Sequence, residues 1–304
     1  MRRLFLVNPR AGGGRALQWW RSIRPRFSAE LESGESCEWI PESPAELALR
    51  LKERLQGAPG EWVIIGGDGT LHSVVNGFSA LRESGDRLGD ALPLIRVAAA
   101  GSGSDYFRSL PEKEAIPVDL VRLTLEGSDS RYFLNMASVG VGAKVAAAKE
   151  RLPAWMPRAL CYALPTVTEI WGARPFRLEM RLAGGGELVR GRAWAVFFSK
   201  GRYAGGGMRF ASEVRLNDGE LEISWIEDRS AFSVFGQIPR LYGEGLRAGG
   251  GVRKFRAAEL ELAFAEPQPF ECDGETGTAR RLAFRVVPAA SSGLRVGRFS
   301  PDRP

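Results

Sequence analysis

Residues 66–70 have the sequence Gly-Gly-Asp-Gly-Thr, between the apolar run Trp62–Ile65 and a segment with helical character that begins at Leu71. The apolar run predicts a buried strand, and the residues after the glycines predict the start of a helix. Glycine lets the backbone turn sharply and approach a ligand closely. The N–H groups at a helix start, together with the helix dipole, favour phosphate. The stretch therefore predicts a phosphate-binding turn between a strand and a helix.

The carboxylate of Asp68 within this turn indicates which kind of phosphate ligand the turn binds. Asp68 would repel phosphate unless a metal ion or a ribose hydroxyl lay between them, so it indicates a nucleotide rather than a bare anion. The alternative is a tight strand-to-helix turn without a ligand. The chain has no GxxxxGK[ST] motif of Walker-type nucleotidases, and it matches the GxGxxG dinucleotide fingerprint only weakly.

Length and composition indicate a soluble protein of two domains. The 304 residues exceed one typical compact core, and the contents of 44% hydrophobic and 26% charged residues are ordinary for globular proteins. The net charge is +6, and lysine occurs at only six positions, so arginine supplies most of the positive charge. Arginine suits phosphate and carboxylate partners. A basic surface could serve nucleic acid, an anionic membrane or a phosphorylated ligand, and a genome-wide arginine bias explains the composition equally well.

Several classes of protein and site can be set aside. Cys37, Cys161 and Cys272 are far apart, which argues against a disulfide framework and for a reducing compartment. Because His72 is the only histidine, we discount a Cys/His zinc site and a Ser-His-Asp triad. The run Leu4–Val7 is too short for a signal peptide, and no stretch of 18 apolar residues occurs. We therefore expect a cytoplasmic protein.

The first part of the chain predicts an α/β domain at residues 1–124. Strands are expected at 4–7, 38–40, 62–65 and 93–99, and helices at 16–27 and 43–55. Three glycine-rich turns follow these strands, at 8–15, 66–70 and 100–105. Alternating strands and helices predict a mostly parallel sheet, whose ligands bind beyond the carboxyl ends of the strands. All three turns fall at that edge, and together they predict one shared site.

The second part predicts a β-rich domain at residues 125–288. Short strands are expected at 132–135, 176–182, 193–198, 221–226, 258–264 and 282–287, and helices at 141–150, 155–171 and 231–247. Many short strands joined by hairpin turns predict an antiparallel, sandwich-like domain. We expect the tail, residues 289–304, to return to the first domain through a strand at 294–296.

With these motifs in place, the chain resembles the diacylglycerol kinase catalytic-domain superfamily, which includes bacterial lipid kinases and sphingosine and ceramide kinases. The GGDGT sequence alone is shared with NAD kinases, whereas the ordered series of motifs is specific and extends over almost the whole chain. The series consists of Asn8-Pro9 with the glycines after it, 66–70, 74–77, 101–105, Phe133-Leu134-Asn135 with Gly140 and Gly142, 205–208, 217–221 and 273–275.

The resemblance implies an N-terminal Rossmann-like sheet with helices, a C-terminal antiparallel β-sandwich-like domain and an active site in the cleft between the domains. It implies ATP and Mg²⁺ as cofactors. The first domain would bind ATP through Asn8, Gly12, Gly13, Gly66, Gly67, Asp68, Gly69, Thr70, Gly101 and Ser102. Because the three turns contain no lysine, Arg15 is the available phosphate cation, with Arg108 as an alternative.

The metal and catalytic residues also follow from the resemblance. Asp68 would contact the magnesium of Mg-ATP, and Asp218 with carbonyls near Arg215 and Glu220 matches a structural magnesium site of bacterial members. The catalytic carboxylates would be Asp273, as general base toward the acceptor hydroxyl, and Glu275, as its orienting partner or a metal contact. We expect Asp68 and Asp273 to face each other across the cleft. The alternatives are an ordinary hairpin turn at Asp218 and a solvated turn at Asp273.

The chain departs from the family pattern at several positions. Serine replaces the usual Glu at 73, Thr and Asn at 102 and 104, Asn at 199 and Pro at 212. These changes leave the identity of the lipid open and motivate a nucleotide- or lipid-binding regulator without turnover as one alternative. An NAD kinase-like enzyme is the other.

The preferred hypothesis is a lipid kinase that phosphorylates a hydroxyl of diacylglycerol or a related lipid. Its partner would be a lipid substrate at a membrane surface rather than nucleic acid, and we allow for a homodimer. The apolar residues 152–171 could lie at the membrane interface or line an acyl groove, or could be an ordinary core helix. We therefore expect a cytoplasmic protein with peripheral contact to the inner face of the membrane.

Overall fold

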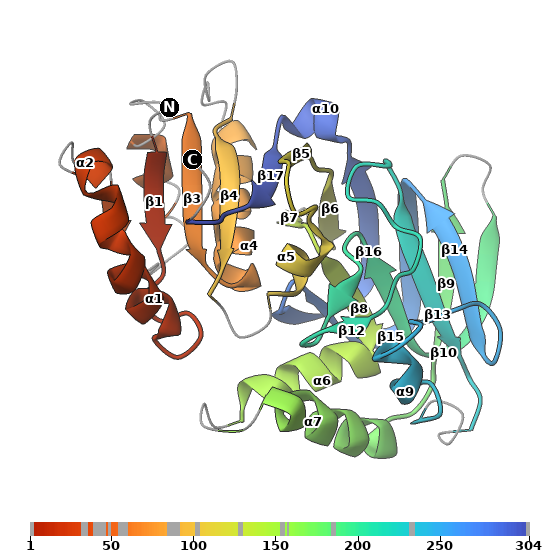
Figure 1. Cartoon of the computed structure of the whole chain (residues 1–304). Helices are drawn as coiled ribbons and strands as arrows, with labels where there is room; N and C mark the ends of the chain where they lie inside the picture. Colours follow the sequence, from red (N-terminus) through yellow and green to blue (C-terminus); the bar gives the residue numbers. More distant parts are fainter. Residues whose placement is uncertain are drawn as a thin grey trace. The chain divides into compact units, whose positions relative to one another are not determined.

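The computed structural model describes residues 3–31, 36–38, 47, 50–53, 60–83, 92–100, 104–126, 130–152, 156, 158–183, 187–230 and 235–301. The chain divides into two units (Figure 1). The first consists of Met1–Val118 and Ala289–Pro304, and the second of Asp119–Pro288. The first unit ends before residue 124, where we expected the boundary, because β6 (Leu120–Leu125) pairs with β16 (Glu275–Val287) of the second unit.

In the first unit, the described strands form a mostly parallel sheet, as expected. Their order is β2-β1-β3-β4-β17-β5, and only the pairing of β17 with β5 is antiparallel among them. The strand β17 comes from the last residues of the chain and lies parallel to β4. The strands are β1 (Arg3–Val7), β2 (Ser36–Glu38), β3 (Glu61–Gly66), β4 (Leu94–Ala99), β5 (Ile116–Pro117) and β17 (Arg295–Arg298).

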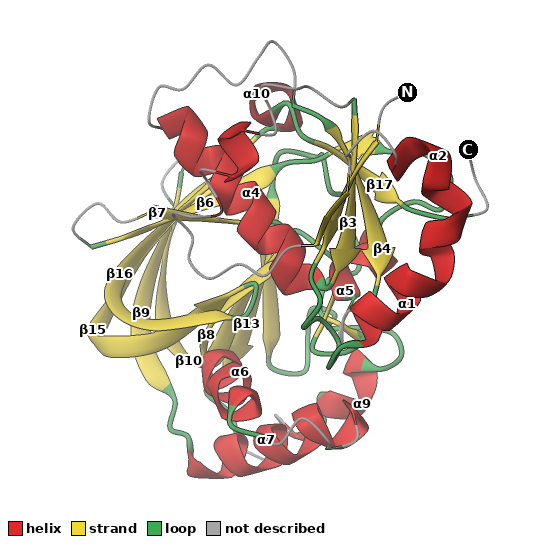
Figure 2. Ribbon diagram, turned by 90° about the vertical axis from the view of Figure 1, so that its left-hand side faces the viewer, coloured by secondary structure: helices red, strands yellow, loops and turns green. Residues whose placement is uncertain are grey.

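Helices cover both faces of this sheet (Figure 2). On one face, Trp20 of α1 packs against Phe5, with ring centroids 4.8 Å apart. On the other face, Phe78 of α4 packs against Trp62, with ring centroids 5.3 Å apart. These buried aromatic pairs lie on opposite faces because successive strand residues alternate in direction. The helices are α1 (Arg15–Ile23), η1 (Arg24–Phe27), α2 (Ser28–Leu31), α4 (Asp68–Glu83), α5 (Asp105–Ser109) and α10 (Ala289–Ser292).

The described strands of the second unit form an antiparallel sheet, again as expected. Their order is β14-β13-β10-β8-β15-β16-β6-β7, and β9 pairs with both β10 and β15. One face of this sheet encloses a buried apolar core in which the rings of Phe198 and Phe284 stack at 4.3 Å. The other elements are β7 (Ser130–Phe133), β8 (Met136–Gly140), α6 (Val141–Glu150), α7 (Arg158–Gly172), β9 (Phe176–Leu182), β10 (Leu188–Ser199), β11 (Tyr203–Ala204), β12 (Met208–Arg209), β13 (Leu221–Glu227), α9 (Ile238–Leu241), β14 (Val252–Ala257) and β15 (Glu259–Cys272).

Strands β8 and β9 lie end to end between β10 and β15. On β10, Ala195 pairs with Gly140 at the end of β8, and Ala193 pairs with Phe176 at the start of β9. The chain between them forms α6 and α7, which lie side by side (Figures 1 and 2). Gly140 has a φ of 85°, and a Cβ there would lie 2.4 Å from the Phe176 ring. The glycine is therefore required where the two strand ends meet.

Some expected helices differ from the structure or fall outside it. Within the described part of residues 231–247, α9 is the only named helix, because Pro239 lies in its first turn and Gly245 has a left-handed φ of 83°. The helix expected at 43–55 and the end of the strand at 38–40 lie largely outside the described residues.

Among the residues that the structure describes, no helix combines the length and apolar character needed to cross a bilayer.

Replacing Gly66 by alanine will destabilise the first unit. A Cβ there would lie 2.4 Å from Thr70 Oγ1 and 2.7 Å from Thr70 Cβ, so the start of α4 would have to move away from β3. Such overpacking should lower the free energy of unfolding, measured by urea denaturation, by about 1–3 kcal/mol.

Gly69→Ala is the matched control for this prediction. A Cβ at Gly69 meets no atom within 4 Å, and the residue lies in α4, so alanine should raise the free energy of unfolding by about 0.5–1 kcal/mol. Equal losses at the two glycines would contradict the steric explanation.

Candidate functional site

Asn8 links the first and second glycine-rich turns of the first unit. Its Nδ2 donates a hydrogen bond to Thr70 Oγ1 at 3.0 Å, and its Oδ1 accepts one from the backbone N–H of Arg10 at 3.0 Å. Thr70 lies in the first turn of α4 and is buried. The side chain of Asn8 therefore fixes the turn after β1 against the start of α4.

The first glycine-rich turn contains three successive glycines in the left-handed conformation. Gly12, Gly13 and Gly14 have left-handed φ values of 62°, 68° and 90°. A Cβ at Gly12 would lie 2.6 Å from the carbonyl oxygen of Ala100, whereas a Cβ at either of the other two would meet no atom within 4 Å. The exposed Arg15 donates from Nε to the carbonyl oxygen of Gly12 at 2.8 Å, and α1 begins without a side-chain cap. A cation beside an uncapped helix start is suited to an anion.

Asp68 links the second and third turns. Its Oδ2 accepts the N–H of Asp105 at 2.8 Å, and its Oδ1 accepts the N–H of Tyr106 at 3.2 Å. These N–H groups begin α5, so Asp68 caps a helix that is distant in the sequence. The preceding Ser104 has a φ of 55°, at the position where the family resemblance expects Asn, a residue that adopts this conformation more readily. A carboxylate has about four lone-pair positions, so these bonds do not exclude a metal contact.

The three turns thus meet at the carboxyl ends of β1, β3 and β4. The contacts of Asn8 with Thr70, of Gly12 with the backbone near β4, and of Asp68 with α5 join them pairwise. Gly67 and Gly69 lie in the same turn, at the accessible start of α4. Gly101 and Ser102 lie outside the described residues.

In the second unit, the carboxylate of Asp273 accepts three backbone N–H groups. Its Oδ2 binds the N–H of Leu134 at 2.9 Å, and its Oδ1 binds those of Asn135 at 3.1 Å and Met136 at 3.0 Å. Asp273 has a φ of 46° in the turn between β15 and β16, and its own N–H donates to the carbonyl oxygen of Met136 at 2.9 Å. The turn with the expected base is therefore held against the segment between β7 and β8.

The neighbours of Asp273 in this turn differ in exposure. Glu275 is exposed at the start of β16, whereas Glu271 is buried and accepts the N–H of Gly274 at 3.1 Å. Cys272 is buried, and this burial, followed by the charge of Asp273, raises the pKa of its thiol well above the ordinary value. The thiol is therefore not a candidate nucleophile. Of the carboxylates in the turn, Asp273 is half-buried and Glu275 is exposed.

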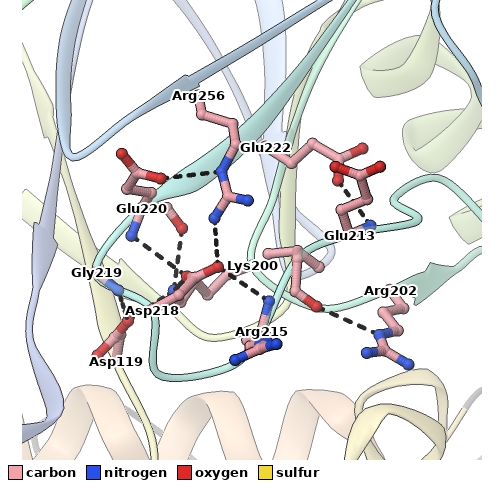
Figure 3. Close-up of polar contacts among 11 residues, drawn as sticks. Asp119, Lys200, Arg202, Glu213, Arg215, Asp218, Gly219, Glu220, Glu222 and Arg256 are labelled. Atoms are coloured by element: carbon pink, nitrogen blue, oxygen red, sulfur yellow. Dashed lines mark hydrogen bonds and ion pairs between the residues drawn. The ribbon is translucent and has the colours of Figure 1, made fainter.

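The residues expected to hold a structural metal do lie together (Figure 3). Asp218 Oδ2 accepts the N–H of Arg215 at 3.2 Å, and Asp218 Oδ1 accepts the N–H of Glu220 at 3.4 Å. The cation among them is the ammonium group of Lys200, whose Nζ lies 2.6 Å from Asp218 Oδ1 and 3.0 Å from the carbonyl oxygen of Glu220. Within the described parts of the chain, no cluster of three or more His, Cys, Asp or Glu side chains could hold a metal ion.

The ionisation of Asp218 reflects this environment. Burial, the largest single influence, favours the neutral acid, but the hydrogen bond and charge of Lys200 and the N–H groups of Arg215 and Glu220 outweigh it. The pKa of Asp218 is therefore lowered from its ordinary value of 3.8. Because the folded state holds the ionised form more strongly, this carboxylate stabilises the fold above its ordinary pKa, and the contribution is lost as pH falls through the lowered value.

Sequence reasoning missed Lys200 and Asp119. Asp119 Oδ2 lies 2.6 Å from Lys200 Nζ and accepts the N–H of Gly219 at 2.8 Å, and the side chains of the aspartate and the lysine are 2% and 0% exposed. The available signal in the sequence was a charged residue close to an apolar run: Lys200 follows the run that ends at Phe198 by two residues, and Asp119 directly precedes Leu120. That pattern indicates a buried ion pair but does not identify the partner.

Each half of the chain matches a known protein family. Residues 2–131 match the family described as diacylglycerol kinase catalytic domain, and residues 135–295 match the family described as YegS C-terminal NAD kinase beta sandwich-like domain. The relatives of this chain include proteins named "Probable lipid kinase YegS-like". The one from Stenotrophomonas maltophilia (strain K279a) is 25% identical over 245 residues, which cover 74% of this chain and 75% of the relative. The one from Shewanella frigidimarina (strain NCIMB 400) is 27% identical over 287 residues, which cover 88% and 87%.

A solved structure shares the fold over nearly the whole chain. The crystal structure of a diacylglycerol kinase from Bacillus anthracis str. Sterne aligns with 98% of this chain and 97% of its own chain. The TM-score is 0.68 at 16% sequence identity. The likeness extends over the sheets of both units.

The substitution Asp273→Asn will destabilise the second unit. The amide keeps one oxygen acceptor but turns its NH2 group toward backbone N–H donors, so the free energy of unfolding should fall by roughly 2 kcal/mol. Urea denaturation measures the loss, and hydrogen exchange at Leu134, Asn135 and Met136 should accelerate.

Glu275→Gln is the control in the same turn. This side chain is exposed, so its free energy of unfolding should stay within about 0.5 kcal/mol of the unsubstituted protein. An Asp273→Asn variant as stable as Glu275→Gln would show that the three N–H bonds do not anchor the turn.

Proposed function

The chain belongs to the family of lipid kinases with a diacylglycerol kinase catalytic domain, and we propose that it transfers the γ-phosphate of ATP to a hydroxyl of diacylglycerol or a related lipid. The observation that carries this proposal is the meeting of three glycine-rich turns at the carboxyl ends of β1, β3 and β4. Ligands of parallel sheets bind at this edge. Phosphoryl transfer suits such a site because its catalysis rests on positioning and on stabilisation of negative charge.

In this proposal, the first unit holds ATP. The left-handed turn at Gly12 and Gly13 and the start of α1 would receive phosphate oxygens, with Arg15 as the nearby cation. Gly67, Thr70, Gly101 and Ser102 belong to the same proposed site. Asp68 would contact the magnesium of the nucleotide, and a bound magnesium ion spreads the charge of the phosphates. Because Asp68 also caps α5, the fold sets the position of its carboxylate before a ligand binds.

The second unit would supply the acid–base chemistry. We assign Asp273 the role of general base, which takes the proton of the acceptor hydroxyl as the phosphate is transferred. Its three N–H bonds support this role, because they hold the carboxylate in one orientation. Glu275, exposed two residues further along the turn, would orient the base or contact metal.

A surface of the second unit supports a lipid as the acceptor. Leu164, Val167 and Trp171, together called the α7 face, are 48%, 50% and 73% exposed. Their spacing of three and four residues puts them on one side of the helix. The Trp171 ring lies 6.5 Å from Phe235, and Tyr242, which follows α9, is 58% exposed. An exposed apolar stripe of this kind indicates an interaction surface.

We propose that the α7 face rests on an anionic bilayer. The exposed Arg174 lies two residues beyond the end of α7, and the exposed Arg240 lies in α9, two residues before Tyr242 in the sequence. Tryptophan and tyrosine favour the membrane interface, and each basic residue near anionic lipid contributes about 1 kcal/mol. Apolar residues flanked by arginine thus fit the charge and polarity of a lipid surface.

With labelled ATP and Mg²⁺, the protein will phosphorylate a lipid from a panel of diacylglycerol, sphingoid base and ceramide in mixed micelles. Asp273→Asn should lower kcat by about 10²–10⁴, because the general base is lost. Glu266→Gln is the matched control, since this exposed carboxylate lies on the adjoining strand β15 and should leave kcat unchanged.

Three results would count against this proposal. One is normal ATP binding without any labelled lipid, the result expected of a binding regulator without turnover. Another is formation of NADP when the protein is incubated with NAD and ATP, which would identify an NAD kinase. The third is full phosphorylation of lipid by Asp273→Asn, which would exclude Asp273 as the general base.

The double variant Val167→Ser, Trp171→Ser will bind phosphatidylglycerol-containing vesicles at least about tenfold more weakly, because apolar area equal to a large side chain is lost. Vesicle co-sedimentation measures the change. Leu188→Ser is the control, since Leu188 is an exposed apolar residue on β10 rather than on α7. Equal binding by the double variant and the control would exclude the α7 face as the lipid contact.

A further inference from the structure

The ammonium group of Lys200 is enclosed within the second unit. Its Nζ lies 2.6 Å from Asp119 Oδ2, 2.6 Å from Asp218 Oδ1 and 3.0 Å from the carbonyl oxygen of Glu220 (Figure 3). The lysine side chain has no exposed surface. An ammonium group has three N–H donors, so these three oxygens match its hydrogen-bonding capacity.

The same three oxygens are of the type that a divalent cation binds. Mg²⁺ and Ca²⁺ prefer carboxylate and carbonyl oxygens. The family resemblance predicts magnesium at Asp218, with carbonyls near Arg215 and Glu220. We propose instead that the ammonium group of Lys200 takes the place of a divalent cation here, so that the second unit keeps its structure without a bound metal.

The remaining contacts of the cluster support this assignment. Arg256 Nη2 lies 2.6 Å from Asp218 Oδ2, and Arg256 Nε lies 2.9 Å from Glu220 Oε2. The backbone N–H groups of Arg215 and Glu220 also donate to Asp218, at Oδ2 and Oδ1, so its carboxylate accepts four hydrogen bonds in all and its lone-pair positions are filled. A divalent ion at this position would be held against two cations that already contact Asp218. The geometry thus favours hydrogen-bond donors over a metal ion at each oxygen of Asp218.

The lysine also supports the segment that holds Asp273. The backbone N–H groups of Lys200 and Gly201 both donate to the carbonyl oxygen of Asn135 at 2.8 Å. The N–H of Asn135 in turn donates to Asp273 Oδ1 at 3.1 Å. These contacts lie within the second unit, so the inference does not depend on the proposed lipid kinase activity.

The first test is thermal unfolding of the full chain without nucleotide, in EDTA and in millimolar MgCl2 or CaCl2. The measured quantity is the metal-induced shift in Tm of the unsubstituted protein compared with that of Asp218→Asn. We expect the two shifts to agree within about 1 °C. A shift larger by about 5 °C or more in the unsubstituted protein would show a metal bound at Asp218 and would overturn the proposal.

A matched pair of Lys200 variants tests whether the ammonium group takes the place of a divalent cation. Lys200→Ala opens space among the three oxygens, whereas Lys200→Met fills it with an uncharged chain. We expect Mg²⁺ or Ca²⁺ to raise the Tm of the alanine variant by about 5 °C or more, and to leave that of the methionine variant unchanged. A folded alanine variant without such a rise would overturn the proposal. If neither Lys200 variant folds, the metal-induced Tm shifts of the unsubstituted protein and Asp218→Asn still show whether a metal binds at Asp218.

Discussion

The contact of the buried Lys200 ammonium with Asp119 and Asp218 is the interaction on which the second unit depends. Loss of one partner from a buried ion pair leaves an uncompensated charge and costs about 3–5 kcal/mol. The contact joins the start of β6, the end of β10 and the turn before β13, which are far apart in the sequence. Through Asn135 it also reaches the segment that holds Asp273. The proposed base and the buried cation therefore belong to one network.

Both units use a carboxylate to hold backbone N–H groups of a distant segment. Asp68 binds the first N–H groups of α5, and Asp273 binds those between β7 and β8. Buried N–H groups without a hydrogen-bond partner destabilise the folded state, so these carboxylates stabilise the fold by accepting their hydrogen bonds. The two residues expected to act on magnesium and on the acceptor are consequently positioned by the backbone. Such preorganisation suits phosphoryl transfer, in which positioning supplies much of the catalysis.

The sequence predicts best the features that depend on neighbouring residues. The strand Phe176–Leu182 was predicted to the residue, because its alternating pattern is local. The glycine-rich turns could also be located, and Gly66 shows why, since only glycine allows β3 and α4 to approach so closely. The partners of Lys200 could not be predicted, because residues 119 and 218 reach it only through strand pairing. Within the described part of 231–247 the named helix is shorter than predicted, because Pro239 fits only the first turn of a helix and Gly245 has a left-handed φ.

The end-to-end arrangement of β8 and β9 has a consequence for how this fold can vary. The chain leaves the sheet at Gly140 and re-enters it at Phe176, while β10 and β15 run past the break on either side. The hydrogen bonds that β10 and β15 make with β8 and β9 therefore do not involve the segment of α6 and α7. Changes on the exposed side of α6 and α7 would therefore alter the surface that these helices present, while the pairs that β10 and β15 make with β8 and β9 keep their register.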